Sequence, residues 1–249
     1  MEYQKDFSSL HESMFDVEMR RRKALTALCV LRNVLGAEVA RSRLLNVGSS
    51  SGIMDAEFAT EFGEVVGIDI DEGAVAHARN NFQRPNLRFE LGDGLNIPFP
   101  EASFDALVCS QVYEHVPDQE RLMAELERVL KPGGVCYFAA TNRFILIEPH
   151  FRLPLLSWLP PTLADFYVRI TGKGSRYYER MRSYPHLRRL VARFDVVDYT
   201  ATVIGDPRAY AFDYLVRPGS LMQAVSGFVA RRLPWICPGY LWILRKRPQ

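Results

Sequence analysis

The sequence predicts an α/β protein with a doubly wound, mostly parallel sheet. Short and almost wholly apolar segments recur between residues 43 and 140, and segments with helical spacing separate them. Strands that are apolar on both sides are typical of parallel sheets covered by helices on each face. Because the crossovers are right-handed, the carboxyl ends of such strands meet at one edge, where ligands bind.

The individual elements follow in chain order from these patterns. An N-terminal helical segment is expected at 10–36, where Gly36 ends it. Strands are expected at 43–48, 65–69, 87–91, 104–109, 135–140, 196–204 and 240–244. Helices are expected at 53–62, 72–82, 118–130, 185–194 and 221–233, with Asp118 as an N-cap and 132–134 as a stop. The result is a seven-stranded sheet with its last strand antiparallel.

The whole chain, 1–249, is interpreted as a single domain. Its core spans 43–142, and 183–249 complete the sheet and add an amphipathic helix. Between them, 143–182 are rich in proline and large apolar residues, which predicts a cap after the fifth strand. Two interpretations of the apolar residues in this cap and in helix 221–236 stay open. They pack a folded cap and a core-facing helix, or they line an apolar pocket or touch a membrane surface.

The amino-acid composition limits the binding partners and the cellular compartment that can be expected. The chain has 249 residues and a formal net charge of +2, so no general attraction to nucleic acid is expected. Basic clusters at 20–23, 231–232 and 245–247 are interpreted as solvated faces and a tail, with a membrane-surface or acidic-substrate role as the alternative. Four scattered cysteines without metal-ligand spacing predict reduced thiols and no metal. A polar N-terminus and the lack of a long apolar run predict a cytoplasmic protein.

A loop rich in glycine and serine, NVGSSSG at 46–52, follows the first expected strand. Such a turn lets a ligand approach the backbone closely, and the next helix supplies free N–H groups. Asp69 ends the second strand about 20 residues later, where an acidic residue accepts hydrogen bonds from ribose hydroxyls in nucleotide-binding folds. Asp71 is an alternative for this role, and Asp69 is alternatively a helix N-cap.

Three further motifs follow in order: Phe104-Asp105, Glu114-His115-Val116, and LKPGG at 130–134. With the loop and Asp69, they make residues 40–142 resemble the class I S-adenosylmethionine-dependent methyltransferases, in particular the ubiquinone and small-molecule branch. The resemblance implies S-adenosylmethionine as cofactor and methyl transfer as activity. A nicotinamide-dependent oxidoreductase shares the loop and Asp69, but it does not explain 93–94 or 130–134.

The resemblance also implies roles by position. The loop surrounds the methionine part of the cofactor, Asp69 holds the ribose, and Ile70 packs on the adenine. Asp93 accepts from the adenine amino group, while Ser110 and Gln111 face the methionine and methyl groups. The full cofactor-binding set is Asn46, Gly48, Ser49, Ser50, Gly52, Asp69, Ile70, Asp93, Gly94, Leu95, Ser110 and Gln111.

Two positions depart from the family pattern. Asn46 stands where an acidic residue is usual, and Ser50 stands where the middle glycine is usual. Ser50 therefore requires a backbone geometry that tolerates a Cβ atom. The departures keep open a second function, a non-catalytic methyltransferase-fold protein that acts as a binding or regulatory partner.

The acceptor can be narrowed by class. Methyl transfer is an in-line displacement that needs alignment, and a hydroxyl acceptor also needs a general base. Candidates for the base are His115, Glu114 and, in the insertion, His150, while Tyr113 is expected to be wall or core. SQVY at 110–113 replaces the Asn/Asp-Pro-Pro-aromatic motif of nucleobase and amide methyltransferases. We therefore expect a small, hydrophobic acceptor such as a lipid, quinone, polyketide or lipid-linked sugar.

Overall fold

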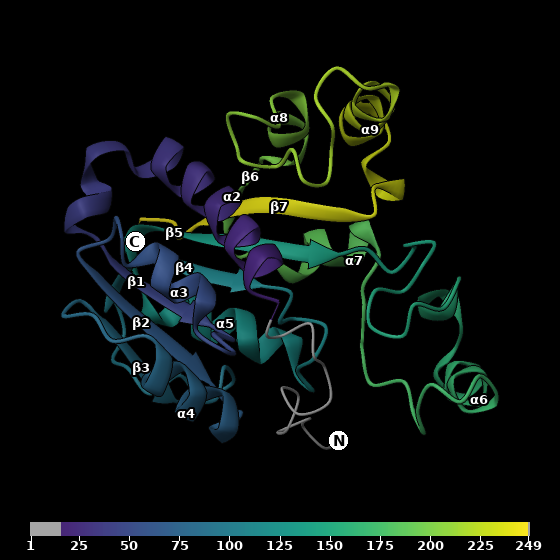
Figure 1. Cartoon of the computed structure of the whole chain (residues 1–249), viewed down its shortest axis with the longest axis horizontal. Helices are drawn as coiled ribbons and strands as arrows, with labels where there is room; N and C mark the ends of the chain where they lie inside the picture. Colours follow the sequence, from purple (N-terminus) through teal and green to yellow (C-terminus); the bar gives the residue numbers. More distant parts are fainter. Residues whose placement is uncertain (1–15, 249) are drawn as a thin grey trace.

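The computed structural model describes residues 16–248 and contains a seven-stranded sheet of order β3-β2-β1-β4-β5-β7-β6 (Figure 1). The strands are β1 Arg43–Val47, β2 Glu64–Asp69, β3 Leu87–Leu91, β4 Phe104–Ser110, β5 Leu130–Thr141, β6 Asp195–Asp198 and β7 Gly239–Arg245. Strands β1 to β5 pair in parallel, and β7 runs antiparallel to both β5 and β6. The predicted sheet, including its antiparallel last strand, is confirmed.

Helices cover both faces of this sheet. They are α2 Val17–Leu35, α3 Ile53–Phe58, α4 Glu72–Asn81, α5 Gln119–Val129, α6 Pro161–Ile170, α7 Tyr184–Leu190, α8 Thr200–Gly205 and α9 Leu221–Arg232. Short 3₁₀ helices span Gly36–Arg41, Leu156–Trp158 and Pro234–Ile236. Helices α2, α3 and α4 lie on one face and α5 and α7 on the other, each over its own apolar cluster (Figure 1). This two-sided burial explains why the strands are apolar throughout.

Aspartate caps position the helices that surround the site. The side chains of Asp16, Asp71 and Asp118 accept hydrogen bonds from backbone N–H groups in the first turns of α2, α4 and α5. Each cap satisfies one donor that the helix itself cannot pair. The predicted N-cap at Asp118 is confirmed. Helix α2 ends before Gly36 as expected, while the expected residues 10–15 lie outside the described part of the chain.

Two expected elements are wrong. The predicted strand 196–204 ends at Asp198, and α8 follows it. The β-branched residues there favour a strand, but Val203 and Ile204 are buried from a helix, so packing overrides local propensity. The expected stop at 132–134 lies inside β5, which begins at Leu130. A register shift against β4 between Phe104 and Ala106 accommodates these extra residues.

Residues 143–182 lie beside the carboxyl edge of the parallel strands, with α6 outermost (Figure 1). They contain a small apolar cluster of their own, formed by Leu153, Leu156, Ala164 and Val168. The insertion therefore packs against itself as well as against the core. Within residues 16–248, none of the helices has both the length and the apolar character needed to cross a bilayer.

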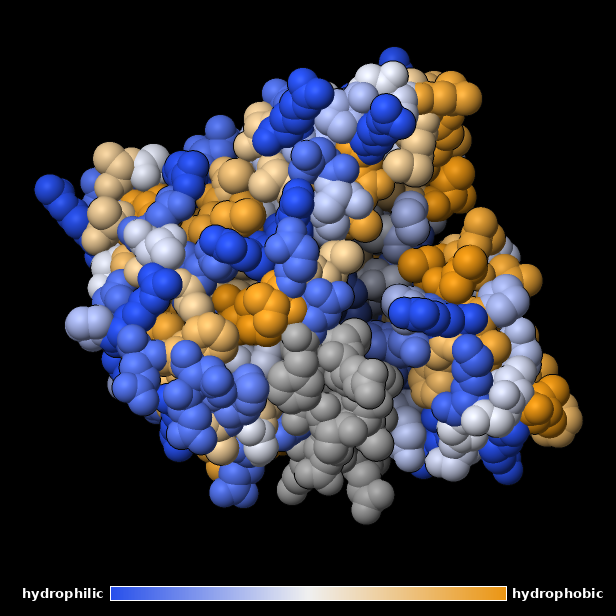
Figure 2. All heavy atoms as spheres, viewed as in Figure 1, coloured by the Kyte–Doolittle hydropathy of each residue, from blue (hydrophilic) through white to orange (hydrophobic). Residues whose placement is uncertain are grey.

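Helix α9 packs on the core mainly through small residues. Gly227 and Ala230 are buried and Ala230 belongs to the core cluster, whereas Leu221, Val225 and Phe228 are 81%, 53% and 56% exposed. The large apolar residues of 221–233 therefore favour the second interpretation, in which they do not pack the core. Figure 2 shows apolar side chains gathered along α9 and on the neighbouring edge of the insertion.

Candidate functional site

A cavity of about 270 Å³ opens at the carboxyl ends of β1, β2 and β4. Most of the predicted cofactor residues line it, namely Asn46, Gly48, Asp69, Ile70, Gly94, Ser110 and Gln111. Ser49, Asp93 and Leu95 lie next to lining residues in the chain, and Ser50 and Gly52 lie two residues from one, but none of the five is part of the wall. Ligands of open α/β sheets bind at this edge.

The glycines of the loop are required by close approaches. Gly48 has φ 80°, and a Cβ atom there would lie 2.6 Å from Cγ2 of Val112. Gly52 has φ 79°, and its Cβ would lie 2.7 Å from Cβ of Ala78. Between them Ser50 adopts φ 52°, a left-handed conformation that costs a non-glycine residue about 1–2 kcal/mol. Ser50 therefore occupies a backbone conformation that favours glycine, whereas the sequence required one that tolerates a Cβ atom.

Asp69 and Asp71 divide the two roles that the sequence left open. Asp71 caps α4, because its Oδ1 accepts from the Ala74 N–H at 3.0 Å. Asp69 lines the cavity, where its Oδ2 accepts from the Ser50 N–H at 2.7 Å and its Oδ1 from the Asp71 N–H at 2.9 Å. Burial raises the pKa of Asp69 above its ordinary value. The acid that faces the cavity is therefore Asp69.

Asp55 on α3 was not predicted as a site residue. It is fully buried, and its Oδ2 accepts from Nδ2 of Asn46 at 2.9 Å. Burial raises the pKa of Asp55 to about 8. Gly67 on β2 makes room for it, since a Cβ atom there would lie 2.7 Å from Oδ1 of Asp55. A carboxyl group, absent at position 46, is thus present next to Asn46. In the sequence, Asp55 was recognisable only as an aspartate in a mostly apolar segment.

Arg20 and Lys23 also line the cavity, from α2. The interpretation of residues 20–23 as a solvated face is therefore incomplete, because half-buried Arg20 and exposed Lys23 also face the cavity. Arg20 interacts electrostatically with Asp69 and Asp55. Burial lowers the pKa of the Lys23 amine. Two cationic side chains at this wall fit the carboxylate of an amino-acid ligand.

The structure brings the three proposed bases together. Ligand atoms of Glu114, His115 and His150 all lie within 4.8 Å of one another. The two imidazole rings have centroids 4.9 Å apart and an interplanar angle of 82°. Glu114 and His115 follow β4, whereas His150 belongs to the insertion. His115 and His150 line the first cavity, and Glu114 lies behind them.

Two more carboxylates surround Glu114. Glu148 and Glu179 are buried, and their charges act on the Glu114 carboxylate. Burial raises the pKa of Glu114 to about 8, and it raises the pKa values of Glu148 and Glu179 to about 7. Both side-chain oxygens of Glu114 and Glu179, and Oε1 of Glu148, have no hydrogen-bond partner among residues 16–248. The sequence analysis missed Glu148 and Glu179, because no motif connects them to Glu114.

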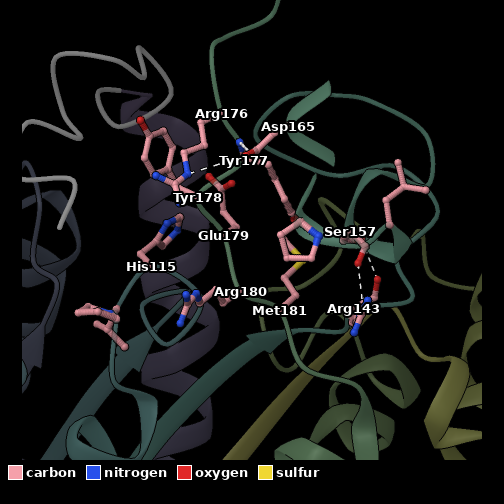
Figure 3. Close-up of a pocket in the computed structure, with 14 residues that line it drawn as sticks. His115, Arg143, Ser157, Asp165, Arg176, Tyr177, Tyr178, Glu179, Arg180 and Met181 are labelled. Atoms are coloured by element: carbon pink, nitrogen blue, oxygen red, sulfur yellow. Dashed lines mark hydrogen bonds and ion pairs between the residues drawn. The ribbon is translucent and has the colours of Figure 1, made fainter. Parts of the chain in front are cut away.

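A second cavity of about 340 Å³ lies between the insertion and the core (Figure 3). His115 lines both cavities, so they adjoin at this residue. Figure 3 shows His115 and Glu179 on one side of the second cavity and Arg143 and Ser157 on the other. Leu159 is the only leucine, phenylalanine or tryptophan of the described insertion in its wall, so the cavity is more polar than expected.

Tyr113 belongs to the core, as predicted. Its side chain is buried, and its hydroxyl donates to the carbonyl oxygen of Thr141 at 2.6 Å. The same hydroxyl accepts from the Arg182 N–H at 3.1 Å. These bonds connect the turn after β4 to the end of β5 and to the insertion, and they hold Glu114 and His115 in place.

Comparisons with known proteins agree with this geometry. Residues 45–138 match the family described as "Methyltransferase domain". The chain is 35% identical over 127 residues to a probable S-adenosylmethionine-dependent methyltransferase of Mycolicibacterium smegmatis, covering 47% of this chain and 48% of the relative. It is 34% identical over 138 residues to a demethylmenaquinone methyltransferase of Tropheryma whipplei, covering 54% of this chain and 55% of the relative. The chain thus spans about half the length of these curated relatives.

The same fold occurs in a solved structure titled as an S-adenosylmethionine-dependent methyltransferase of Methanosarcina mazei. The TM-score is 0.57 at 20% sequence identity, and the match covers 88% of this chain and 98% of the other. The cavity at the strand ends, the family match and these relatives lead to one assignment. Residues 45–138 form a methyltransferase domain of the S-adenosylmethionine-dependent class, and S-adenosylmethionine is its cofactor.

Proposed function

We propose that the whole chain transfers a methyl group from S-adenosylmethionine to an oxygen on the polar head of an amphiphilic acceptor. The observation that carries this proposal is the pair of cavities that adjoin at His115. The first has the acidic and backbone groups that suit a nucleoside with an amino-acid tail. The second is a separate space of about 340 Å³ for the acceptor head.

The reaction balances with these groups. The acceptor oxygen forms a bond to the methyl carbon, and the bond between that carbon and sulfur breaks with its electron pair going to sulfur. S-adenosylhomocysteine leaves, and the acceptor loses its proton. Glu114, His115 and His150 stand where the cavities adjoin, so we assign the handling of this proton to them. Alignment of the oxygen with the methyl group supplies much of the rate.

The acceptor's apolar part is assigned to the outer surface. The wall of the second cavity carries Arg143, Arg176, Arg180 and Asp165, which suit a polar head. Apolar side chains are instead exposed on α6 and α9, where Leu163, Phe166 and Ile170 follow helical spacing on α6. A lipid, quinone, polyketide or lipid-linked sugar has both parts. The relative named a demethylmenaquinone methyltransferase supports a quinone-like acceptor.

Label transfer tests this function. The chain is incubated with methyl-tritiated S-adenosylmethionine and three amphiphiles, namely a prenylated quinol, an alkyl glycoside and an acylated phenol, each beside its head group alone. We expect label in at least one amphiphile and much less in its free head group. The variant Asp69→Ala, which lacks the ribose acceptor, should abolish transfer. Equal labelling of tailed and tailless acceptors would contradict the amphiphilic assignment, and no transfer from a cofactor-binding chain would favour a binding or regulatory partner.

A further inference from the structure

The region where the two cavities meet contains buried carboxyl groups that nearby cationic side chains do not fully neutralise. Glu114, Glu148 and Glu179 are 0%, 0% and 5% exposed, and five of their six carboxylate oxygens have no hydrogen-bond partner among the described residues. Unpaired buried carboxylates are costly, and buried charges are normally paired or coordinate metals. Lys23 is the described cation whose charge acts on Glu114, and it is itself partly desolvated.

Two imidazoles complete a set of ligand atoms around Glu114. One oxygen of Glu114 and one nitrogen from each of His115 and His150 lie within 4.8 Å of one another. Ligands at about 2.0–2.1 Å from a tetrahedral ion are roughly 3.3 Å apart, so modest side-chain rotation would close this set around an ion. His115 and His150 are half-buried, and an imidazole that binds an ion through one nitrogen keeps its second nitrogen for an orienting hydrogen bond.

The backbone around these ligands is fixed. The Arg180 N–H donates to the carbonyl oxygen of Glu114 at 2.7 Å, which ties the turn after β4 to the insertion. Oε2 of Glu148 accepts from the N–H groups of His150 and Phe151 at 2.9 and 2.6 Å. One carboxylate of the cluster therefore holds the turn that presents His150. A ligand set on two braced segments can form without large movement of the chain.

We infer that Glu114, His115 and His150 bind a divalent first-row transition-metal ion such as Zn²⁺, Mn²⁺ or Co²⁺. Two imidazoles and one carboxylate favour such ions over Mg²⁺ or Ca²⁺, which prefer oxygen ligands. The sequence analysis expected no metal, because the ligands come from segments that are distant in the chain. Three protein ligands leave at least one coordination position open.

The open coordination position of the ion indicates which class of acceptor would bind. This second part of the inference rests on the proposed function. The ion lies where the acceptor cavity meets the cofactor cavity, so it takes the acceptor's hydroxyl oxygen. A bound ion would lower the pKa of a coordinated hydroxyl, so Glu114, His115 and His150 would act on the acceptor proton through the ion, and Glu179 in the wall of the acceptor cavity would accept that proton. The oxygen then attacks the methyl carbon as described above. The fitting head groups are those with a hydroxyl beside a second oxygen, such as vicinal diols and hydroxycarbonyls.

Metal binding can be measured without cofactor or acceptor. The metal-free chain is titrated with Co²⁺ while the visible ligand-field absorption is followed, and then with Zn²⁺ by calorimetry. We expect saturation at about one ion per chain, with absorption typical of mixed nitrogen and oxygen ligands. The variants Glu114→Gln and His150→Ala should weaken binding by about 100-fold or more, beyond the 10–100-fold typical of residues that only support ligands.

Matched variants separate coordination from general attraction of cations. His186→Ala removes an exposed histidine on α7 and should leave the titration unchanged. Glu179→Gln removes a nearby charge and should weaken binding less than Glu114→Gln does. Far-ultraviolet circular dichroism and urea unfolding show that each variant is folded. If Glu179→Gln and Glu114→Gln weaken Co²⁺ binding equally while His150→Ala has no effect, coordination is refuted, as it is if the native chain binds no Co²⁺. Cofactor binding is scored separately, so failure of the metal site leaves the methyltransferase proposal standing.

Discussion

Asn46 and Asp55 show where a carboxyl group lies when the usual acidic position of the loop holds an amide. The amide of Asn46 donates to the buried carboxyl of Asp55 at 2.9 Å. The first acidic residue of the loop is therefore replaced by an amide with an acid behind it. Asn46 by itself is therefore no evidence that the cofactor-binding site has lost its function.

Lys23 allows a test of the cofactor cavity at the scale of one side chain. Its amine lines the cavity beside Arg20, where it suits the carboxylate of the cofactor. We expect Lys23→Met to weaken S-adenosylhomocysteine binding by about tenfold, which corresponds to roughly 1.4 kcal/mol. Calorimetry measures the effect, and Lys173→Met, an exposed lysine of the insertion, is the control. Equal affinities of the two variants would refute a role for Lys23.

Glu114 predicts a pH-dependent stability of the metal-free chain. Burial raises its pKa to about 8 from an ordinary value of 4.5, so the folded chain binds this proton more tightly than the unfolded chain does. The stability is fully present below about pH 4.5 and is lost as the pH rises through about 8. Glu148 and Glu179 contribute in the same direction, whereas the charge of Lys23 opposes the shift.

Urea unfolding at pH 5, 7 and 9 measures this dependence. The native chain should lose free energy of unfolding across the series, by on the order of a few kcal/mol. Glu114→Gln should reduce the slope, because an amide at this position does not titrate, while Asp55, Glu148 and Glu179 still do. A variant whose stability falls with pH as steeply as that of the native chain would show that Glu114 ionises freely in the folded state.

At the scale of elements, the loop between β1 and α3 is a place where backbone and packing act together. Gly52 and Gly133 have φ values of 79° and 76°, but only Gly52 is crowded. A Cβ atom at Gly52 would lie 2.7 Å from Cβ of Ala78, whereas at Gly133 it would meet nothing within 4 Å. Their comparison separates the cost of the left-handed backbone from the cost of the clash.

We expect Gly133→Ala to lower the free energy of unfolding by about 1–2 kcal/mol, the cost of a left-handed alanine. Gly52→Ala should cost about 1–3 kcal/mol more, because overpacking adds to the strain. Chemical denaturation of both variants gives the two values. Equal losses would show that α4 moves away from the loop without cost.

The core elements could be predicted from sequence, whereas elements after residue 142 were predicted less well. Between 43 and 140 the inner strands β1, β2 and β4 are buried on both faces, so their apolar pattern is unambiguous. Residues Thr200–Gly205 are mostly β-branched or apolar, which favours a strand. They form a helix because this conformation packs against α9 and buries Val203 and Ile204. At the site, the loop directly follows β1 and Asp69 ends β2, so both could be predicted from the sequence. Asp55, Glu148 and Glu179 were not, because tertiary structure brings them to the site.

At the scale of the whole molecule, α6 and α9 both expose large apolar side chains, and basic residues border those of α9. Leu221, Phe228 and Trp235 are each more than half exposed, and Arg231 and Arg232 are exposed at the end of α9. Exposed apolar area bordered by cations is typical of contact with an anionic membrane surface. We therefore propose peripheral membrane contact as the route by which the acceptor reaches the site.

Vesicle flotation tests this contact. The chain should float with vesicles of anionic phosphatidylglycerol and bind less well to neutral phosphatidylcholine. Phe228→Asp should reduce flotation by about tenfold, because it places a charge within the apolar face. Val197→Asp, at an equally exposed apolar residue on β6, is the matched control and should float as the native chain does. Loss of binding in both variants, or in neither, would exclude α9 as the contact surface.

The central claim is that the cavity at the ends of β1, β2 and β4 binds the methyl donor. The most direct measurement is calorimetry of S-adenosylhomocysteine with the native chain, Asp69→Asn, and the exposed-surface control Asp213→Asn. The structure predicts binding to the native chain and the control, with a loss of about tenfold or more in Asp69→Asn. A folded native chain that binds no S-adenosylhomocysteine, or an Asp69→Asn variant that binds it as tightly, would contradict the account.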